Sequence, residues 1–236
     1  MKIIGIIPSR MESIRLPGKP LLKIGEKTMI QRVYESAKKC KELDELFVAT
    51  PNKKIYDHVN QFGNVVMTSK KPLNGTERVY EAYSAIGVKY DYIINIQGDE
   101  PFIKVEQIQD LIKIFKKSNG ICTLVFEENY SKRLEINSVI KVVKTHNNEA
   151  LYFSRSLIPF GDNKVYLRHI CIYGYKTSIL KKIVDLQPSA LEKSESLEQL
   201  RWLENGFKIK LNKTKFDSFS VDTKEDLTLA NRLINK

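Results

Sequence analysis

The sequence predicts an α/β fold with a mostly parallel, Rossmann-like sheet, helices on both faces, and a small lid or dimerisation element. Two observations support this. Through the first half of the chain, strand-like apolar runs alternate with segments of helical spacing, the order expected of right-handed βαβ units. Beyond about residue 120, longer and more irregular connections join the strand-like runs. We therefore expect one domain over residues 1–236, with a first part to about 120 and a second part, 121–236, that completes the sheet.

The expected elements follow in order along the chain. Each strand is a short run of β-branched and other apolar residues, and each helix spaces apolar residues three and four apart. The first half gives strands at 3–7, 46–50, 65–67 and 92–96, with helices at 29–40, 53–62 and 77–86 between them and one at 105–117 after them. The second half gives strands at 121–126, 139–144, 168–175 and 208–213, and helices at 194–205 and 224–234.

The loop after the first strand is the most informative segment. It reads Pro-Ser-Arg-Met-Glu-Ser-Ile-Arg-Leu-Pro-Gly-Lys-Pro over residues 8–20, with cations at Arg10, Arg15 and Lys19 and a turn position at Gly18. Open α/β sheets bind ligands at loops that leave the carboxyl ends of their strands. Three spaced cations with N–H groups between them suit a triphosphate. A solvated basic turn is the alternative.

Two acidic residues elsewhere in the chain lie next to predicted elements. Asp99 comes directly after the strand at 92–96, and Asp222 precedes the helix at 224–234. Two carboxylates brought to one site suit a hard cation such as Mg²⁺ that bridges phosphate oxygens. The alternatives are a strand-ending turn for Asp99 and a helix N-cap for Asp222.

Several function classes are disfavoured. The sequence contains neither G-x-G-x-x-G nor G-x-x-x-x-G-K-[ST], which disfavours dinucleotide-dependent dehydrogenases and P-loop ATPases. The net charge is +11, but the lysine doublets are scattered and no nucleic-acid-binding motif accompanies them, so no nucleic-acid partner is expected. With no long apolar run or signal-peptide pattern, we expect a cytoplasmic protein that does not insert into membranes. The three cysteines lack a paired spacing and are expected to be buried free thiols.

A family resemblance runs nearly end to end. It rests on motifs that occur in a fixed order: Ile7–Arg10 with Arg15–Pro20, Gly75–Arg78, Asn95–Pro101, Tyr152–Arg155, Arg168–Ile170 with Ile172–Tyr175, Leu197–Arg201 and Val221–Thr223. In this combination the chain resembles the 3-deoxy-D-manno-octulosonate (Kdo) cytidylyltransferases, the CMP-Kdo synthetases of lipopolysaccharide biosynthesis.

The resemblance implies that CTP and Kdo react to give CMP-Kdo and pyrophosphate, on a homodimer with a nucleotidyltransferase sheet. It implies that the first part of the chain binds the nucleotide and the second binds the sugar. It also implies roles for single residues. Arg10, Arg15 and Lys19 would hold the triphosphate, and Asp99 and Asp222 would ligate Mg²⁺. The implied catalytic set is Arg10, Lys19, Asp99 and Asp222, and the nucleotide-binding set adds Arg15, Asn74, Gly75, Arg78 and Gln97.

The sugar acid is expected to contact mainly the second half of the chain. Arg155 is the expected partner of the Kdo carboxylate, because a guanidinium can bind it through two parallel hydrogen bonds. The hydroxyls of Kdo would be bound by Gln97, His169, Tyr173, Glu198 and Gln199. The alternatives are that His169 is a hydrogen-bonded core residue, and that Glu198 and Gln199 are solvated or lie in dimer contacts.

The chain departs from the family pattern near the predicted nucleotide site. It has Pro72 and Asn74 where the family commonly has His and Ser, and Pro51-Asn52 where an Asp usually follows Ala-Thr. These changes affect the expected nucleotide selectivity and leave the cations and carboxylates in place. An 8-amino variant of Kdo is therefore an alternative substrate. A basic nucleic-acid-binding module and an inactive scaffold are alternatives from other classes.

Overall fold

The computed structural model describes residues 1–115, 117–118, 120–161 and 164–234. The chain divides into two compact units, Met1–Ile108 with Ser218–Lys236, and Gln109–Asp217. The boundary at residue 108 lies near the expected division at about residue 120. The segment from Ser218 onward belongs with the first unit, because it packs on that unit's core.

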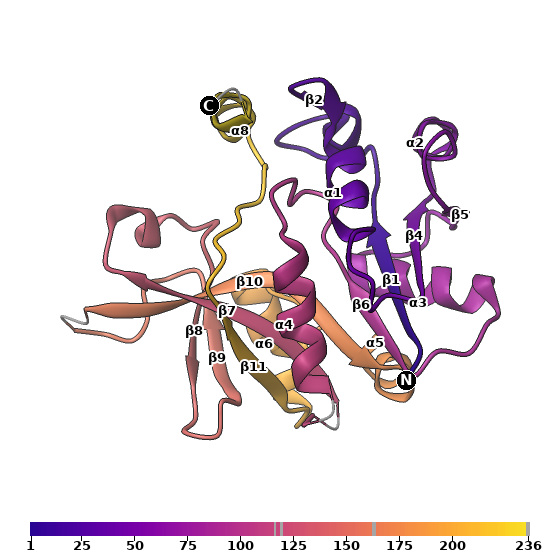
Figure 1. Cartoon of the computed structure of the whole chain (residues 1–236). Helices are drawn as coiled ribbons and strands as arrows, with labels where there is room; N and C mark the ends of the chain where they lie inside the picture. The colour runs from indigo at the N-terminus through magenta and orange to yellow at the C-terminus, as the bar shows by residue number, and fades with distance from the viewer. Residues whose placement is uncertain (116, 119, 162–163, 235–236) are drawn as a thin grey trace. The chain divides into compact units, whose positions relative to one another are not determined.

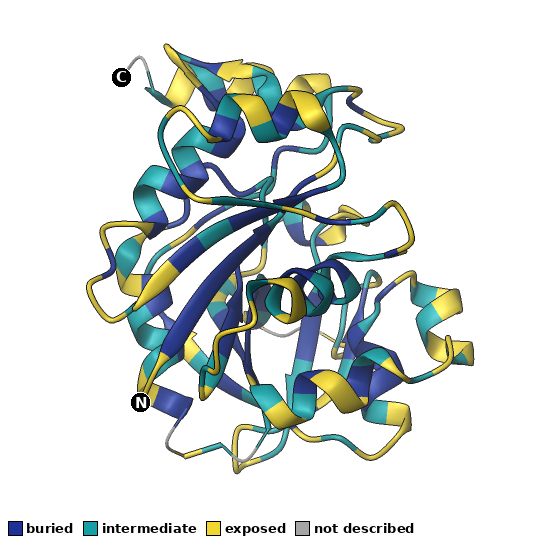
Figure 2. Cartoon of the chain, turned by 90° about the vertical axis from the view of Figure 1, so that its right-hand side faces the viewer, coloured by how far each residue is buried: buried dark blue, intermediate teal, exposed yellow. Residues whose placement is uncertain are grey.

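Four parallel strands form the sheet of the first unit (Figure 1), in the order β5, β4, β1, β6. Their bounds are β1 Ile3–Pro8, β4 Glu45–Thr50, β5 Val65–Met67 and β6 Tyr92–Asn95. Ile3, Ile4, Ile6 and Ile7 are fully or almost fully buried, and the strand that leaves the N-terminus is coloured as buried along most of its length in Figure 2. The chain builds outward from β1 to β5 and then returns to place β6 on the other side of β1. The strand order therefore reverses at β1, and such a switch point opens a ligand crevice at the carboxyl ends of the strands.

Helices cover both faces of this sheet. They are α1 Met29–Ala37, α2 Lys53–Val59 and α3 Gly75–Ile86. Right-handed crossovers place α1 and α2 on one face. The crossover through α3 runs in the opposite direction along the sheet and so places that helix on the other face, where it contacts β1, β4, β5 and β6. The predicted parallel sheet with two helical faces is thus confirmed in the first unit.

The C-terminal helix α8, Lys224–Ile234, completes the first unit. Ala230 and Val221 are buried in one apolar cluster with Leu16, Ile24 and Met29. Ile24 belongs to a short hairpin, β2 Lys23–Ile24 with β3 Lys27–Thr28, which follows the 3₁₀ turn η1 Lys19–Leu21. This cluster anchors the basic loop from below, because Leu16 lies within that loop.

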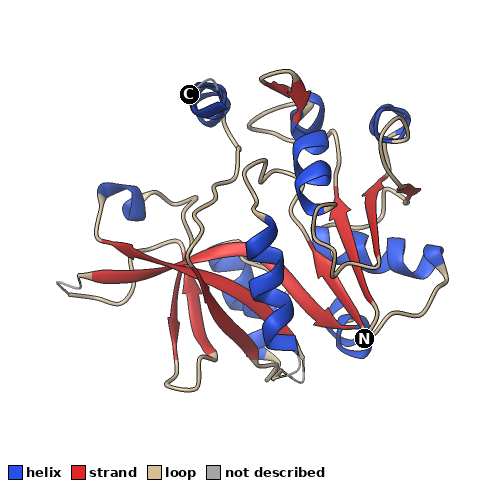
Figure 3. Ribbon diagram, viewed as in Figure 1, coloured by secondary structure: helices blue, strands red, loops and turns tan. Residues whose placement is uncertain are grey.

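The second unit contains a mixed sheet, whose strands are drawn in red in Figure 3. Strand β7 pairs in parallel with β11 and antiparallel with β10, and β8 pairs antiparallel with β10 and β9. The strands are β7 Ile121–Asn129, β8 Lys141–Lys144, β9 Ala150–Ser154, β10 Val165–Lys176 and β11 Ile209–Thr214. The helices are α5 Thr177–Val184, α6 Ala190–Glu195, α7 Gln199–Glu204 and the 3₁₀ turn η2 Lys132–Glu135, and α4 Val105–Phe115 crosses the boundary between the units.

The predicted elements are present, with ends shifted by up to three residues, except for one helix. The helix predicted over 194–205 is wrong: α6 ends at Glu195, and α7 begins at Gln199. Ser196 has φ 52°, a left-handed conformation that ends a helix. Helix α5 and strand β9 were not predicted. The prediction of a helix over 105–117 includes residue 116, which lies outside the described residues, and α4 ends at Phe115.

The cysteines and the helix lengths bear on two further expectations. Cys40, Cys122 and Cys171 are free thiols, and the first two are buried as predicted, whereas Cys171 is half-buried. Burial raises the pKa of the Cys40 and Cys122 thiols to about 11. Among the described residues, no helix combines the length and the apolar character that crossing a membrane requires.

Candidate active site

The basic loop after β1 is held in place by its own backbone and by one buried side chain. Gly18 has φ 69°, and its N–H donates to the Met11 carbonyl at 3.2 Å, which closes the loop on itself. The predicted turn at Gly18 is therefore confirmed, since a positive φ of this size favours glycine. Leu16 is buried in the apolar cluster below, while Arg10 and Arg15 remain exposed. The loop thus presents its cations outward from a fixed base.

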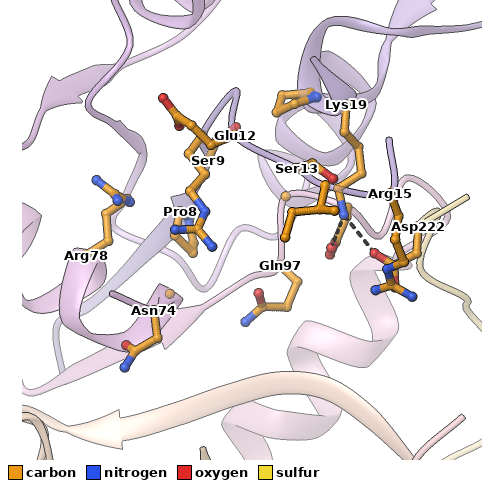
Figure 4. Close-up of a pocket in the computed structure, with 16 residues that line it drawn as sticks. Pro8, Ser9, Glu12, Ser13, Arg15, Lys19, Asn74, Arg78, Gln97 and Asp222 are labelled. Carbon is orange, nitrogen blue, oxygen red and sulfur yellow. Dashed lines mark hydrogen bonds and ion pairs between the residues drawn. The ribbon is translucent and has the colours of Figure 1, made fainter. Parts of the chain in front are cut away.

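A cavity of about 390 Å³ lies between this loop and the carboxyl ends of β1 and β6. Its volume is within the range of small-molecule sites. The predicted residues Arg10, Arg15, Lys19, Asn74, Gly75, Arg78, Gln97, Asp99 and Asp222 all line it, together with Pro8, Ser9, Glu12, Ser13, Ile14, Pro20 and Gly98 (Figure 4). The structure therefore brings together every residue of the predicted nucleotide-binding and metal-binding sets.

Lys19 lies at one end of the cavity, between the two predicted metal ligands. Its Nζ is 2.7 Å from Asp99 Oδ2 and 2.9 Å from Asp222 Oδ1 (Figure 4). Arg15 Nη2 adds an ion pair to Asp222 Oδ2 at 3.1 Å. The backbone N–H of Val221 donates to the Asp99 carbonyl at 2.9 Å and so ties the two acidic segments together. Two carboxylates, distant in sequence, thus converge on one cationic centre.

The electrostatics of this triad favour its charged form. Burial opposes the charge on Lys19, but the Asp99 and Asp222 carboxylates outweigh burial and raise the pKa of the ammonium. Burial likewise opposes the charge on Asp222, and Lys19 and Arg15 outweigh it, so the pKa of this carboxyl is lowered. Lys19 and Asp222 are therefore both held in their charged forms at neutral pH.

Asp222 does not cap helix α8, so the alternative prediction for this residue is wrong. Thr223 is the residue that caps α8: its Oγ1 accepts from the Asp226 N–H at 3.1 Å, and Asp226 Oδ2 accepts from the Thr223 N–H at 2.9 Å. This reciprocal pair is a capping box. The Asp222 side chain is left to face Lys19 and Arg15.

The opposite end of the cavity is formed by the start of α3 and the end of β6. Asn74 caps α3 by accepting from the Glu77 N–H at 2.8 Å. Gln97 Nε2 donates to Asn95 Oδ1 at 3.2 Å. Ser9 Oγ, which lines the cavity after β1, and Asn95 Nδ2, at the end of β6, are buried and have no hydrogen-bond partner among the described residues. Buried polar groups are rarely left unpaired, so this end of the cavity is suited to a polar ligand.

Arg78 supports the wall of the cavity. Its guanidinium donates to Thr68 Oγ1 at 2.8 Å, to the Ser69 carbonyl at 3.1 Å and to the Pro72 carbonyl at 3.3 Å. Burial and the nearby charge of Arg10 lower its pKa. Arg78 therefore fixes the 68–72 segment, and direct contact with a nucleotide stays a prediction.

Glu12 is a cavity residue that the sequence analysis missed. Its Oε1 accepts from Asn52 Nδ2 at 3.1 Å, and Asn52 Oδ1 accepts from the Met11 N–H at 2.9 Å. The Asn52 hydrogen bond is the main reason that the pKa of Glu12 is lowered. An Asp at position 52 would place two carboxylates together. The sequence did contain a signal for this residue, since Glu12 is the single acidic residue in the loop that carries Arg10, Arg15 and Lys19.

The predicted sugar-binding residues other than Gln97 belong to the second unit. His169 is buried, and its Nε2 is 2.9 Å from Thr123 Oγ1. Burial, assisted by the charge of Arg168, lowers the pKa of His169 to about 3, so the ring is neutral. Tyr173 packs against His169 with ring centroids 5.2 Å apart, and burial raises the pKa of its hydroxyl. Gln199 is buried at the start of α7, and Glu198, next to it, is half-buried.

Arg155 has backbone partners in this structure. Its Nε, Nη1 and Nη2 donate to the carbonyls of Glu195, Asn137 and Ser196, at 2.6, 2.8 and 3.1 Å. These bonds hold the C-terminal end of α6. The expected pairing of Arg155 with a sugar carboxylate would require these donors to be shared or released, and it stays a prediction.

The carboxylate oxygens of Asp99 and Asp222 are suited to a hard divalent cation. The two carboxylates already surround one positive charge, that of Lys19. No cluster of three or more His, Cys, Asp or Glu side chains that could hold a metal occurs among the described residues. A cation here would thus have two protein carboxylates and take its other ligands from phosphate oxygens and water, the usual arrangement for Mg²⁺.

Comparisons with known proteins agree on one family. The family model for cytidylyltransferases matches residues 4–210. A 3-deoxy-manno-octulosonate cytidylyltransferase of Parabacteroides distasonis is 49% identical, over 98% of this chain and 97% of its own. An 8-amino-3,8-dideoxy-manno-octulosonate cytidylyltransferase of Shewanella frigidimarina is 43% identical, over 96% of both chains.

Solved structures give the same result. A CMP:2-keto-3-deoxy-manno-octonic acid synthetase complexed with CTP matches with a TM-score of 0.92 and 35% identity, over 100% of this chain and 99% of its own. A 4-diphosphocytidyl-2C-methyl-D-erythritol synthase from Anaerococcus prevotii matches with a TM-score of 0.66 and 13% identity, which shows a shared fold only. The predicted nucleotidyltransferase fold is confirmed.

Proposed function

The chain belongs to the 3-deoxy-manno-octulosonate cytidylyltransferase family, and from this we propose that it activates Kdo with CTP. The products are CMP-Kdo and pyrophosphate, and CMP-Kdo serves lipopolysaccharide biosynthesis. The observation that carries the proposal is the cavity at the switch point of the sheet, where the cations of the basic loop meet Asp99 and Asp222. Family membership also favours an enzyme over a nucleic-acid-binding module or an inactive scaffold.

In the proposed reaction the anomeric hydroxyl oxygen of Kdo bonds to the α-phosphorus of CTP. The bond from that phosphorus to the bridging oxygen of the β-phosphate breaks, pyrophosphate leaves with the electron pair, and the hydroxyl proton is released. Arg10, Arg15 and Lys19 hold the triphosphate and stabilise the charge that develops on it. Ser9 Oγ, which lines the cavity and has no hydrogen-bond partner among the described residues, binds a polar atom of the base or ribose.

Mg²⁺ is the proposed cofactor, with Asp99 and Asp222 as its protein ligands. When bound, it would neutralise phosphate charge and orient the phosphate oxygens. Lys19 holds both carboxylates in the free protein, so its ammonium must move away from them when the metal binds. Movement toward the phosphates would leave Lys19 where the triphosphate needs a cation.

A homodimer in the cytoplasm is the proposed form of the enzyme. Support for the dimer comes from large apolar side chains exposed in the second unit: Tyr130, Ile136, Leu151, Phe160 and Val165. Support for the cytoplasm comes from the substrate, because CTP is made and used there. Light scattering on the purified chain would measure the oligomeric state, and a mass of 27.3 kDa would rule out the dimer.

A pyrophosphate-release assay tests the proposed activity. CTP and Mg²⁺ are supplied with Kdo, with 8-amino-Kdo or with no sugar acid, and UTP replaces CTP as a control. We expect release with CTP and Kdo and little with UTP. Preference for 8-amino-Kdo would instead assign the substrate that the Shewanella frigidimarina relative is named for. No release with either sugar acid would overturn the proposal.

A further inference from the structure

Three buried polar atoms in the second unit have no hydrogen-bond partner among the described residues. They are Tyr173 Oη, Gln199 Nε2 and Trp202 Nε1. Their residues are 6%, 5% and 1% exposed. Leaving such a group buried and unpaired destabilises the folded protein. Three unpaired groups in one unit point to a partner that the free protein does not itself supply.

The three groups belong to one cluster. The ring of Trp202 meets that of Tyr173 edge-on, with centroids 5.2 Å apart. Gln199 and Trp202 are three residues apart on α7, so they share a face of that helix. His169, which also packs against Tyr173, has a partner in Thr123. The unsatisfied atoms are thus confined to Tyr173 and the adjoining face of α7.

The chemistry of the cluster defines the ligand that would satisfy it. The indole N–H of Trp202 and the amide NH₂ of Gln199 can only donate, and the Tyr173 hydroxyl can donate as well as accept. The complementary ligand is therefore one rich in oxygens that accept hydrogen bonds. A sugar acid, with its hydroxyls and carboxylate, has such oxygens. Tyr173 and Gln199 are already expected to contact the sugar, and Trp202 adds a third donor beside them.

We propose that the indole N–H of Trp202 donates a hydrogen bond to an oxygen of the bound sugar acid, which makes Trp202 a further substrate-binding residue. This inference rests on the proposed function and extends it. Loss of one neutral hydrogen bond typically weakens binding about 3- to 10-fold, so this is the expected change in affinity for the sugar acid.

The first test compares Trp202→Phe with wild type in the pyrophosphate-release assay, using the full-length chain with Mg²⁺. Phenylalanine keeps an aromatic ring and removes the donor. We expect KM for Kdo to rise about 3- to 10-fold, with kcat and KM for CTP within twofold of wild type. Tyr175→Phe is the matched control, since Tyr175 lies in the same aromatic cluster, 5.8 Å from Trp202 by ring centroids. An equal rise in the control would assign the effect to packing and overturn the proposal.

The second test observes the donor in the wild-type chain, so it does not depend on a variant that folds. Trp202 is the single tryptophan of the sequence, and a ¹⁵N-labelled sample gives one indole N–H resonance. Titration with Kdo should move its proton downfield in a saturable way, as expected for a new hydrogen bond, while D-mannose at the same concentration should not. A resonance unmoved by Kdo would overturn the proposal and assign the N–H to a bound water.

The two tests separate this inference from the proposed function. If wild type releases pyrophosphate with Kdo while Trp202→Phe keeps the wild-type KM, the inference fails and the proposed function stands. If wild type is inactive with both Kdo and 8-amino-Kdo, the proposed function fails. In that case, a saturable shift of the indole resonance by Kdo would still support Trp202 as a sugar-acid contact. The absence of a shift would overturn the inference about Trp202 as well.

Discussion

Lys19 is the residue on which the free active site depends, because its ammonium neutralises two carboxylates that would otherwise repel each other. Asp99 and Asp222 both lie within 3 Å of Nζ. The proposed Mg²⁺ ligands are thus already held together by the Lys19 side chain in the free protein. The free enzyme and the metal-bound enzyme would differ in which cation stands between the carboxylates.

Asp222→Asn should remove most turnover and leave the fold intact. A carboxamide is a poorer ligand for a hard divalent cation, and it also loses the charge that attracts Lys19 and Arg15. We expect kcat to fall on the order of 10²-fold or more, measured by pyrophosphate release, with an unchanged circular dichroism spectrum. Glu225→Gln is the control: it makes the matching change from carboxylate to amide at an exposed position in the first turn of α8, so it should keep kcat within twofold. Near-normal turnover in Asp222→Asn would return that residue to a structural role.

Lys19→Met should strengthen metal binding to the nucleotide-free protein. The substitution keeps an unbranched side chain but removes the charge that competes for the carboxylates. In a titration followed by the electron paramagnetic resonance of free Mn²⁺, we expect weak binding to wild type and at least several-fold tighter binding to Lys19→Met. The same variant should lose about 10²–10³-fold in kcat, because a fixed cation near the transferring phosphorus is gone. Equal Mn²⁺ affinities would show that Lys19 does not compete with the metal.

At the scale of elements, the basic loop is positioned by contacts from outside itself. Leu16 anchors it to the α8 cluster, and Asn52, at the start of α2, holds both the backbone of Met11 and the carboxylate of Glu12. The negative charge of Glu12 lies within a cavity suited to an anion. Its pairing with the Asn52 amide helps to fix its position there.

Asn52→Asp should disturb the loop through like-charge repulsion with Glu12. The substitution keeps an acceptor for the Met11 N–H and removes the donor to Glu12. We expect KM for CTP to rise about fivefold, equivalent to about 1 kcal/mol. The double variant Asn52→Asp with Glu12→Gln exchanges amide and carboxylate between the two positions, so it should recover most of the loss. A double variant no better than Asn52→Asp alone would mean that the two residues are not coupled.

The elements that position the site could be predicted because their signals are local. Two strand ends could be identified in the sequence. One is the apolar run of β1 followed by the cationic loop, and the other is the acidic turn after β6. Parallel strands bring such ends to one edge of a sheet. That Thr223 and not Asp222 caps α8 was not predicted, because both residue types cap helices and only the positions of their hydrogen-bond partners distinguish them. The break at Ser196 was missed since the residue is not glycine. The Glu12–Asn52 pair joins residues 40 apart, beyond any sequence period.

At the scale of the whole molecule, a buried neutral histidine makes the second unit sensitive to acid. His169 is buried, with a pKa of about 3 in the folded protein against 6.5 for an unperturbed histidine. Between these values the unfolded chain binds a proton at this position and the folded chain does not. Stability therefore falls as the pH drops below 6.5, by about 1.4 kcal/mol per pH unit for one such group, and levels off near pH 3. Burial lowers the pKa of His58 as well, so that residue has an effect of the same sign.

His169→Gln should remove this part of the acid sensitivity. Glutamine does not titrate, and its amide can take the place of the imidazole as a partner for Thr123 Oγ1. We expect the variant to be less stable than wild type at pH 7 and the difference to shrink steadily toward pH 4, because only wild type loses the contribution of a neutral His169. Urea unfolding at pH 7, 6, 5 and 4, followed by the fluorescence of Trp202 in the same unit, measures the difference. A constant difference across this range would mean that the folded protein accepts a proton on His169, and that the ring is accessible to water or to a charged ligand.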